Sequence, residues 1–328
     1  MLKKPKILVV GSLNMDLIIS TGKFPASGET VMGCAFSTAA GGKGANQAVQ
    51  AALLGAEVTM VGKVGDDAFG KELLASAAAA GINTSHILVD GEKPTGTAAI
   101  LLEVEEDKKA KNRIIIVSGT NMAITPADIE FLREGIAEYD MVMLQLEIAM
   151  DINILVAQFA HAKGVPVMLN SAPYAPLPAE LLSHIAYISP NEHEAADLTG
   201  VSIRSDKSGV NMEDVRAATA KLLTLGVQNA IITLGSNGAV LTNADESIYA
   251  PCVDIVQVKD PTAAGDSFVG GFCTAVAAGL SHGEALEFAS YTATLTVSRM
   301  GAQPSLPTLA EVTALMKQDG KTPPDMIQ

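Results

Sequence analysis

Several features that would identify other classes of protein are scarce or missing in this sequence. Tryptophan is absent from its 328 residues, and Phe and Tyr are few. Acidic residues outnumber basic ones, so the formal net charge is −14. Such a charge argues against a general nucleic-acid binder or a protein of the membrane surface. A phosphate group can still bind locally, because backbone N–H groups can hold it.

Cysteines and long apolar runs are also scarce. Cys34, Cys252 and Cys273 are far apart, and no pair has the spacing of metal ligands. An odd number without a framework pattern predicts reduced thiols and a cytoplasmic protein. The apolar run after Lys6 is too short for a signal peptide, and no run reaches the ~18 apolar residues of a membrane span.

Regular alternation of strands and helices is the main pattern that is present. Nearly half of the residues are hydrophobic, which allows a sizeable core. Repeated βαβ units predict an α/β fold with three layers (α/β/α) and a mainly parallel sheet. Strands are predicted at 7–11, 57–64, 141–146, 165–169, 186–189 and 230–234, helices at 65–80, 127–139, 152–163, 212–225, 284–298 and 309–317, and a loop at 199–212.

Two further segments are extended but do not fit the βαβ series. Residues 14–38 and 95–118 predict a small antiparallel sheet apart from the main one, with the polar residues 105–111 at a hairpin tip. No linker or internal repeat divides the chain. We therefore expect a single domain over residues 1–318, with a disordered tail at 319–328.

The stretch 259–272 carries the strongest chemical pattern. After an extended run at 254–258, the small residues Ala263, Ala264 and Gly265 open a helix that is predicted to reach about Gly279. Free N–H groups at such a helix start can bind an anion, and Asp266 lies beside them. A carboxylate next to an anion site suits phosphoryl transfer. The alternative is a helix start with small residues that allow close packing.

A second glycine-rich turn spans Gly41 to Asn46, before a helix predicted at 47–54. Lys43 and Asn46 are hydrogen-bond donors at the start of that helix. The turn lacks the Walker spacing of glycines and Lys-Ser/Thr. The first strand is not followed by Gly-x-Gly-x-x-Gly, which argues against a dinucleotide-dependent oxidoreductase.

Polar residues recur where the predicted parallel strands end. Each of them alone could be a surface loop residue or a helix cap. Because the carboxyl ends of parallel strands lie at one edge of a sheet, their recurrence there predicts a ligand site. The residues are Glu147, Asn170, Asn191, Glu194, Gly235, Asp260 and Thr262.

Four of these stretches together resemble the ribokinase (phosphofructokinase-B) carbohydrate kinase family. They are Gly11–Asp16, Gly41–Gln47, Asn191–Glu194 and Thr262–Phe268, and the similarity runs from about residue 5 to about residue 310. The resemblance implies ATP-dependent phosphorylation of D-ribose at its 5-hydroxyl. Deoxyribose, another pentose or a nucleoside stays open as the acceptor. A sugar-binding protein without turnover is a further alternative, against which the intact Asp266 argues.

The resemblance also implies residue roles. Asp266 would be the base, with Ala263, Ala264 and Gly265 as the anion hole. The sugar would be held by Asn14, Asp16, Gly42, Lys43, Asn46 and Glu147. ATP would lie against Asn191, Glu194, Thr233, Gly235, Ser236, Gly238, Gly265 and Ser290, with Mg²⁺ reached by Glu194 through water. An activating K⁺ would lie at Asp260, Thr262, Thr296, Arg299, Gly301 and Ser305. The small sheet would act as a lid and as the contact of a homodimer.

Overall fold

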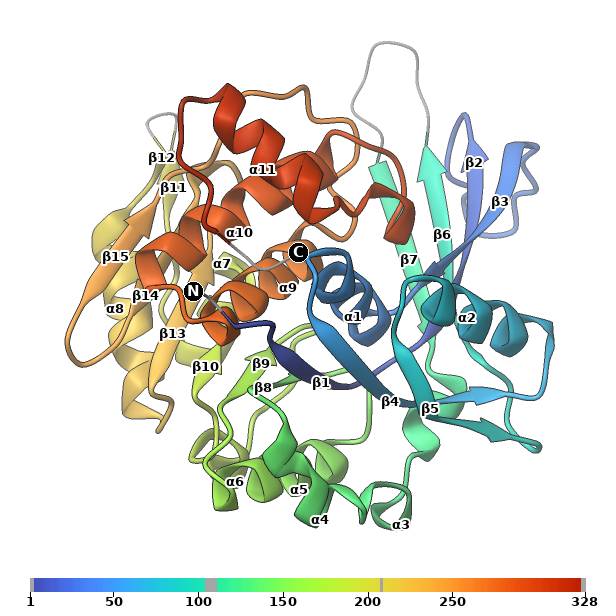
Figure 1. Cartoon of the computed structure of the whole chain (residues 1–328). Coiled ribbons are helices and arrows are strands. Elements are labelled where there is room, and N and C mark those ends of the chain that lie inside the picture. Colours follow the sequence, from blue (N-terminus) through green and yellow to red (C-terminus); the bar gives the residue numbers. More distant parts are fainter. Residues whose placement is uncertain (1–2, 104–110, 207–208, 326–328) are drawn as a thin grey trace.

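A nine-stranded sheet forms the centre of the molecule, and helices cover both of its faces (Figure 1). The computed structural model describes residues 3–103, 111–206 and 209–325. All neighbouring strands pair in parallel except β13–β14 and β14–β15. The order is β15 (Ser247–Ala250), β14 (Ala239–Thr242), β13 (Asn229–Thr233), β10 (Tyr187–Ile188), β9 (Val167–Asn170), β8 (Met141–Gln145), β1 (Lys6–Val10), β4 (Glu57–Gly65), β5 (Asn83–Asp90).

Alternate residues of the central strands pack into two separate cores. In β1, Ile7 and Val9 face one core and Leu8 and Val10 the other, and all four are fully buried. This is expected of a strand that is covered on both faces, and it confirms the predicted three layers. The first core contains α1 (Lys43–Leu53), α2 (Ala68–Ala79), α9 (Ala264–Ala278), α10 (His282–Val297) and α11 (Leu309–Gln318), and the second α3 (Pro126–Ile129), α4 (Leu132–Gly135), α5 (Met150–Ala162), α6 (Ala179–Leu182), α7 (Glu192–Thr199) and α8 (Met212–Thr224).

A second, smaller sheet stands to one side of the main one (Figure 1). We call it the lid sheet; it consists of β3 (Gly33–Gly41), β2 (Asn14–Thr21), β6 (Gly96–Glu103) and β7 (Lys111–Val117), in that order. Its two outer pairs are antiparallel, and the central pair, β2 with β6, is parallel. The separate sheet was predicted. Its predicted hairpin tip lies outside the described residues, apart from Lys111.

Two predicted helices have different bounds. The helix predicted at 47–54 begins four residues earlier, at Lys43, because Gly42 turns the chain directly from β3 into α1 with a φ of 91°. The single helix predicted at 127–139 is instead α3, α4 and a 3₁₀ turn at Ile136–Glu138. Gly135 is the last residue of α4, directly before the 3₁₀ turn, and glycine is unfavourable in the interior of a helix.

Four short strands were not predicted, and one predicted extended run is not a strand. Residues 254–258 carry no strand, and the edge of the sheet is completed by β14 and β15 instead. The region 199–212, predicted as a loop, contains the short pair β11 (Ser205–Asp206) and β12 (Gly209–Val210). Strands of two to four residues have too few positions for a clear alternation, so the pattern could not identify them.

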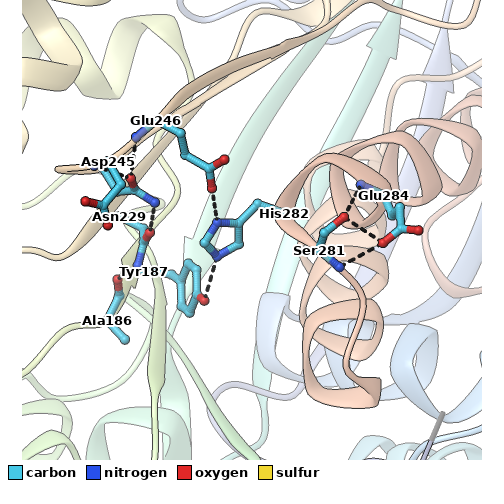
Figure 2. A network of polar contacts seen from close by, with 9 residues as sticks. Ala186, Tyr187, Asn229, Asp245, Glu246, Ser281, His282 and Glu284 are labelled. Atoms are coloured by element: carbon cyan, nitrogen blue, oxygen red, sulfur yellow. Dashed lines mark hydrogen bonds and ion pairs between the residues drawn. The ribbon is translucent and has the colours of Figure 1, made fainter. Parts of the chain in front are cut away.

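At the amino-terminal edge of the sheet, a polar network joins β10, α10 and the turn between β14 and β15 (Figure 2). The Tyr187 hydroxyl lies 3.0 Å from His282 Nε2, and His282 Nδ1 lies 2.7 Å from Glu246 Oε1. Asn243 Nδ2 donates to Asn229 Oδ1 at 2.9 Å. The network therefore attaches the antiparallel edge strands to the parallel part of the sheet.

The last described residues contact the body of the protein. The Tyr291 hydroxyl donates to the Asp319 carboxylate, and Lys321 forms an ion pair of 2.6 Å with Glu287. Residues 326–328 of the predicted tail lie outside the described residues. No helix in the described ranges has the length and apolar character of a membrane span.

Candidate active site

A cavity of about 240 Å³ lies at the carboxyl-terminal edge of the parallel strands. Polar side chains from several elements converge on it, as ligand sites at this edge of α/β sheets do. Its lining is Lys43, Asn170, Ala172, Ser189, Asn191, Glu194, Thr233, Pro261, Ala263, Ala264, Gly265, Asp266 and Val269. The structure therefore brings together the glycine-rich turn, the strand ends and the start of α9, which the sequence predicted to form one site.

The start of α9 has an unusual backbone. Ala263 has φ 59° and ψ 9°, the one left-handed conformation among the described non-glycine residues. This conformation costs about 1–2 kcal/mol for an L-residue. Within the described chain, the N–H groups of Gly265 and Asp266 have no protein acceptor. A left-handed residue followed by free helix N–H groups forms a concave anion-binding site.

Asp266 is buried and is held from two sides. Its Oδ2 accepts from Asn46 Nδ2 at 2.9 Å, and its Oδ1 accepts from Gln47 Nε2 at 3.0 Å. The side chain is only 6 % exposed, yet it lines the cavity. An ionised carboxylate can accept about four hydrogen bonds, so these two leave room to accept a proton from a ligand hydroxyl.

Three of the six predicted sugar-binding residues, Asn14, Lys43 and Glu147, meet at one carboxylate, and of the six only Lys43 is in the cavity lining. Glu147 Oε2 accepts from Ser12 Oγ at 2.5 Å, from the Lys43 backbone N–H at 3.1 Å and from Asn14 Nδ2 at 3.4 Å. Gly42 allows this close assembly, since a Cβ there would lie 2.7 Å from the Asn14 backbone nitrogen. Carboxylate and amide groups fixed in this way can bind the hydroxyls of a polyol.

The electrostatics of this side follow from burial and from crowded carboxylates. Burial raises the pKa of Asp16 from 3.8 to about 7, and the charges of Glu147 and Asp266 add to this rise. Burial lowers the pKa of Lys43, but the carboxylates of Asp266, Glu147 and Glu194 outweigh it and raise that pKa overall. Lys43 therefore stays charged and partly balances the acidic groups.

On the opposite side, Asn191 and Glu194 cap the start of α7. The Asn191 side chain accepts from the Glu194 N–H at 2.8 Å, and Glu194 Oε2 accepts from the Asn191 N–H at 2.9 Å. Burial raises the pKa of Glu194, and the like charges of Glu192 and Asp266 contribute further. Both residues therefore cap the helix, as one of the two interpretations of the sequence predicted, and both also line the cavity.

The remaining residues predicted to contact the nucleotide are divided. Thr233 lines the cavity, and its strand end pairs with Asn191. Gly235 and Ser236 are exposed at the turn after β13, outside the cavity lining, as is the half-buried Gly238. Ser290 is buried and donates to the Leu286 carbonyl of its own helix, so its hydroxyl is engaged within α10.

Two of the predicted potassium residues, Thr262 and Gly301, contact Asp260, whereas the side chains of the other three have different partners. Asp260 Oδ1 accepts from the Thr262 N–H and hydroxyl at 2.9 and 2.6 Å, and Oδ2 accepts from the Gly301 N–H at 2.9 Å. Ser305 donates to the Ala302 carbonyl. The Thr296 hydroxyl lies 2.6 Å from Ser267 Oγ, and the Arg299 guanidinium pairs with Glu311 at 2.6 Å.

The donor sets limit which ions could bind. Among the described residues, no group of three or more His, Cys, Asp or Glu could hold a metal ion. A Mg²⁺ ion prefers oxygen ligands and retains several waters in proteins, and the carboxylates in the cavity lining are those of Glu194 and Asp266. Asp260, Thr262, Thr296 and Ser305 contribute side-chain oxygen atoms, the type of donor that a hard cation prefers.

The structure adds buried amides that the sequence analysis did not assign. Asn121, on the 3₁₀ turn Gly119–Ala123, donates to Asn14 Oδ1 at 2.7 Å and accepts from the Leu13 N–H at 2.9 Å. Gln145 Nε2 donates to Gln47 Oε1 at 2.7 Å. The sequence contains a signal for Gln145, because this polar amide interrupts the apolar run 141–146. Asn121 had no such signal.

Comparisons with known proteins identify the family of this chain. The model of the pfkB family of carbohydrate kinases matches residues 4–309. Ribokinase from Schizosaccharomyces pombe is 40% identical over 315 residues, covering 93% of this chain and 96% of the relative. Ribokinase from Bacillus subtilis is 38% identical over 310 residues, with 94% and 99% covered.

A solved structure shares the fold as well. The structure of Arabidopsis thaliana ribokinase complexed with ribose and ATP superposes with a TM-score of 0.86 at 37% identity, covering 96% of this chain and 99% of that one. A family match over nearly the whole chain, together with relatives of this similarity, establishes the family. The chain belongs to the pfkB family of carbohydrate kinases.

Proposed function

We propose that this chain transfers the γ-phosphoryl group of ATP to the 5-hydroxyl of D-ribose. The observation that carries the proposal is the buried Asp266 carboxylate, which lines the cavity next to the left-handed turn at Ala263. The ribokinases among its relatives, one of them solved with ribose and ATP, support ribose as the acceptor and ATP as the donor.

In the proposed reaction, Asp266 accepts the proton of the 5-hydroxyl as its oxygen attacks the γ-phosphorus. The bond from that phosphorus to the ADP oxygen breaks, and its electrons stay with ADP. The free N–H groups of Gly265 and Asp266 stabilise the charge of the transferring group, and Ala263 and Ala264 form the turn that presents them. The Ala264 N–H itself donates to the Pro261 carbonyl at 3.2 Å, contrary to the expectation that it is free for an anion. The Lys43 ammonium adds a positive charge to this side.

Sugar recognition falls to the polar residues near the lid sheet. Asn46 is suited to it, because its Oδ1 is buried without a protein partner while its Nδ2 binds Asp266. A hydroxyl that donates to this oxygen removes the cost of an unpaired buried acceptor. The other proposed sugar-binding groups are Asn14, Asp16, Gly42, Lys43 and Glu147.

The nucleotide would lie along Asn191, Glu194, Thr233 and Gly265, and would extend past the exposed turn at Gly235, Ser236 and Gly238 towards Ser290. Mg²⁺, reached by Glu194 through water, supplies positive charge that neutralises the phosphates. K⁺ would lie against backbone carbonyls and the Asp260 carboxylate, at Thr262, Thr296, Arg299, Gly301 and Ser305. In this proposal neither ion takes part in the proton transfer, which Asp266 carries out.

The lid sheet would close over the sugar and exclude water, which limits hydrolysis of ATP. Phe36 and the run Ile114–Val117 leave apolar side chains exposed on this sheet, and such surfaces occur at protein interfaces. We infer a homodimer through the lid sheet.

We further infer one kinase domain at 1–318, followed by the tail 319–328, in a cytoplasmic protein.

The test is an assay of ATP turnover with D-ribose, 2-deoxy-D-ribose, other pentoses and nucleosides. We expect the highest kcat/KM with D-ribose. A higher value with deoxyribose or a nucleoside would assign the alternative acceptor, and ATP turnover with none of them would contradict the kinase proposal. Replacing K⁺ by Na⁺ tests the ion site, since equal rates in both salts would remove K⁺ from the proposal.

A further inference from the structure

Gln47, on α1, is the second amide that contacts Asp266. It is fully buried, and its Nε2 donates to Asp266 Oδ1 at 3.0 Å and to Asn170 Oδ1 at 3.2 Å. Its Oε1 accepts from Gln145 Nε2 at 2.7 Å. Both N–H groups and the carbonyl oxygen therefore have protein partners. Gln47 thus lacks the free polar atom that a direct contact with the substrate requires.

The orientation of this amide follows from the chemistry of its partners. An ionised carboxylate only accepts, so the NH₂ group of Gln47 must face Asp266. Its oxygen then faces Gln145, which must donate. Asn170 Nδ2 donates to the Ser189 carbonyl at 2.8 Å, which turns Asn170 Oδ1 towards Gln47. The sheet, through β8 and β9, therefore fixes how Gln47 presents its N–H to Asp266.

The position of Gln145 is itself enforced by packing. Gln145 is fully buried, and a Cβ at Gly11 would lie 2.2 Å from Gln145 Oε1. The glycine at the end of β1 therefore leaves the space that this amide occupies. Asn153 Nδ2 donates to the Gln145 backbone carbonyl at 2.8 Å. A chain of contacts thus runs from the centre of the sheet through Gln145 and Gln47 to Asp266.

Asn46 and Gln47 are adjacent but differently used. Asn46 keeps a buried oxygen without a protein partner, as a residue that contacts substrate would, whereas all polar atoms of Gln47 are occupied. Together they give each oxygen of the Asp266 carboxylate one donor. Two donors on different oxygens fix the plane of the carboxylate, and hence the direction in which its remaining lone pairs point.

We propose that Gln47 is a positioning residue that fixes the orientation of the Asp266 carboxylate, and that Gln145 acts on Asp266 through Gln47. This inference rests on the proposed role of Asp266 as the base. The charged groups near Asp266 are Lys43, Asp16 and Glu194. Gln47 is neutral and therefore orients the carboxylate without changing the charge of the site.

The experiment compares Gln47→Met, Gln145→Met and the double variant, each of which removes an amide while keeping its volume. We expect Gln47→Met to lower kcat by about 30-fold, since a hydrogen bond to a charged group is lost. The KM values for ribose and ATP should change by less than about 3-fold, because Gln47 does not contact the substrate. Gln145→Met should lower kcat by about 5-fold. The double variant should match Gln47→Met, because Gln145 acts through Gln47.

Gln50→Met is the matched control. Gln50 is a fully buried glutamine one turn further along α1. It donates to the Pro307 carbonyl and accepts from Ser267 Oγ at 3.0 Å, and neither bond involves Asp266. It should lower the thermal midpoint about as much as Gln47→Met while changing kcat far less. Equal effects of Gln47→Met and Gln50→Met on kcat would mean that any buried amide of α1 matters, and would overturn the proposal.

Two further outcomes would overturn it. One is multiplicative losses of kcat in the double variant, and the other is a crystal structure of Gln47→Met in which the Asp266 carboxylate is unchanged. Should Gln47→Met fail to fold, a crystal structure of Gln145→Met decides, since a Gln47 amide that keeps its orientation there contradicts the proposal. A wild-type protein without activity on ribose would refute the proposed function alone, and the carboxylate orientation would still test Gln47.

Discussion

The two edges of the main sheet carry polar networks of different kinds. At the amino-terminal edge, Tyr187, His282 and Glu246 are joined by contacts of 3.0 and 2.7 Å (Figure 2). At the carboxyl-terminal edge, Asn46 Oδ1 and Ser189 Oγ are buried without a protein partner. Both edges include ends of the same strand, β10, so the difference does not come from the strands themselves.

The difference separates a structural network from a binding site. Buried polar groups that only hold the fold together pair with one another, because an unpaired group costs about 1–3 kcal/mol. Of these two unpaired groups, Ser189 lines the cavity, and Asn46 is joined to the cavity residue Asp266 by a hydrogen bond. A ligand with several hydroxyls would pair them. An unpaired buried atom alone does not identify a site, since His184 Nδ1, three residues before β10, also has no protein partner. What distinguishes the carboxyl-terminal edge is the cavity that Asp266 lines.

Removing a carboxylate from each edge of the sheet should give the largest difference in kcat between two variants. Asp266→Asn should lower kcat about 10³-fold, because the proton acceptor is lost, while ribose affinity measured by calorimetry stays nearly the same. Glu246→Gln is the control at the other edge and should keep kcat within about 2-fold. A comparable loss in both variants would abolish the distinction, and an Asp266→Asn protein near the wild-type rate would remove Asp266 as the base.

Asp16→Asn tests whether the buried Asp16 carboxylate lowers the stability of the fold. The pKa of Asp16 in the fold is raised to about 7 from 3.8, so its contribution to stability is fully present below pH 3.8 and is lost as the pH rises through 7. Asparagine has no such penalty. Without ligand, Asp16→Asn should therefore be more stable than the wild type at pH 8, by up to about 4 kcal/mol.

The thermal midpoints of both proteins at pH 5 and pH 8 measure this effect. The advantage of Asp16→Asn should be clearly smaller at pH 5, where the unfolded wild-type chain has gained only part of the free energy that ionising Asp16 yields at pH 8. An advantage of the same size at both pH values would contradict a raised pKa. Ribose binding should weaken in the variant, which would show that the residue that lowers stability is needed for binding.

Substitutions at Ala263 test the backbone strain at the functional edge. Ala263→Gly should raise the free energy of unfolding by about 1 kcal/mol, since glycine adopts the left-handed conformation without strain. Ala263→Val should lower it, because a β-branched residue fits this conformation poorly. Thermal denaturation measures both. A glycine variant less stable than the wild type would show that the turn is not strained.

Tyr187→Phe tests the amino-terminal edge and has the smallest expected effect. It removes the hydroxyl that contacts His282 and should cost about 1 kcal/mol of stability, measured by chemical denaturation. The value of kcat should stay within about 2-fold. If instead kcat fell while stability stayed the same, the amino-terminal network would have a functional role and the comparison between the edges would fail.

The sequence by itself determined the layers and the start of α9. Apolar strands with alternating helices predicted the three-layer fold. The small residues before Asp266 predicted a helix to about Gly279, and α9 ends at Ala278. These signals are local, because the period of a strand or helix is encoded in neighbouring residues. The broken helix over 127–139 and the short edge strands were missed, because their local patterns are weak or misleading.

The tertiary structure alone decided which polar groups meet. Gln47 contacts Asp266 across 219 positions of sequence, and Asn121 contacts Asn14 across 107. Composition and periodicity carry no information on such pairs, since they depend on how helices and strands are placed in space. The same holds for the difference between the two edges of the sheet. Residue types predicted a polar site, but only the packed fold determined which buried atoms stay unpaired.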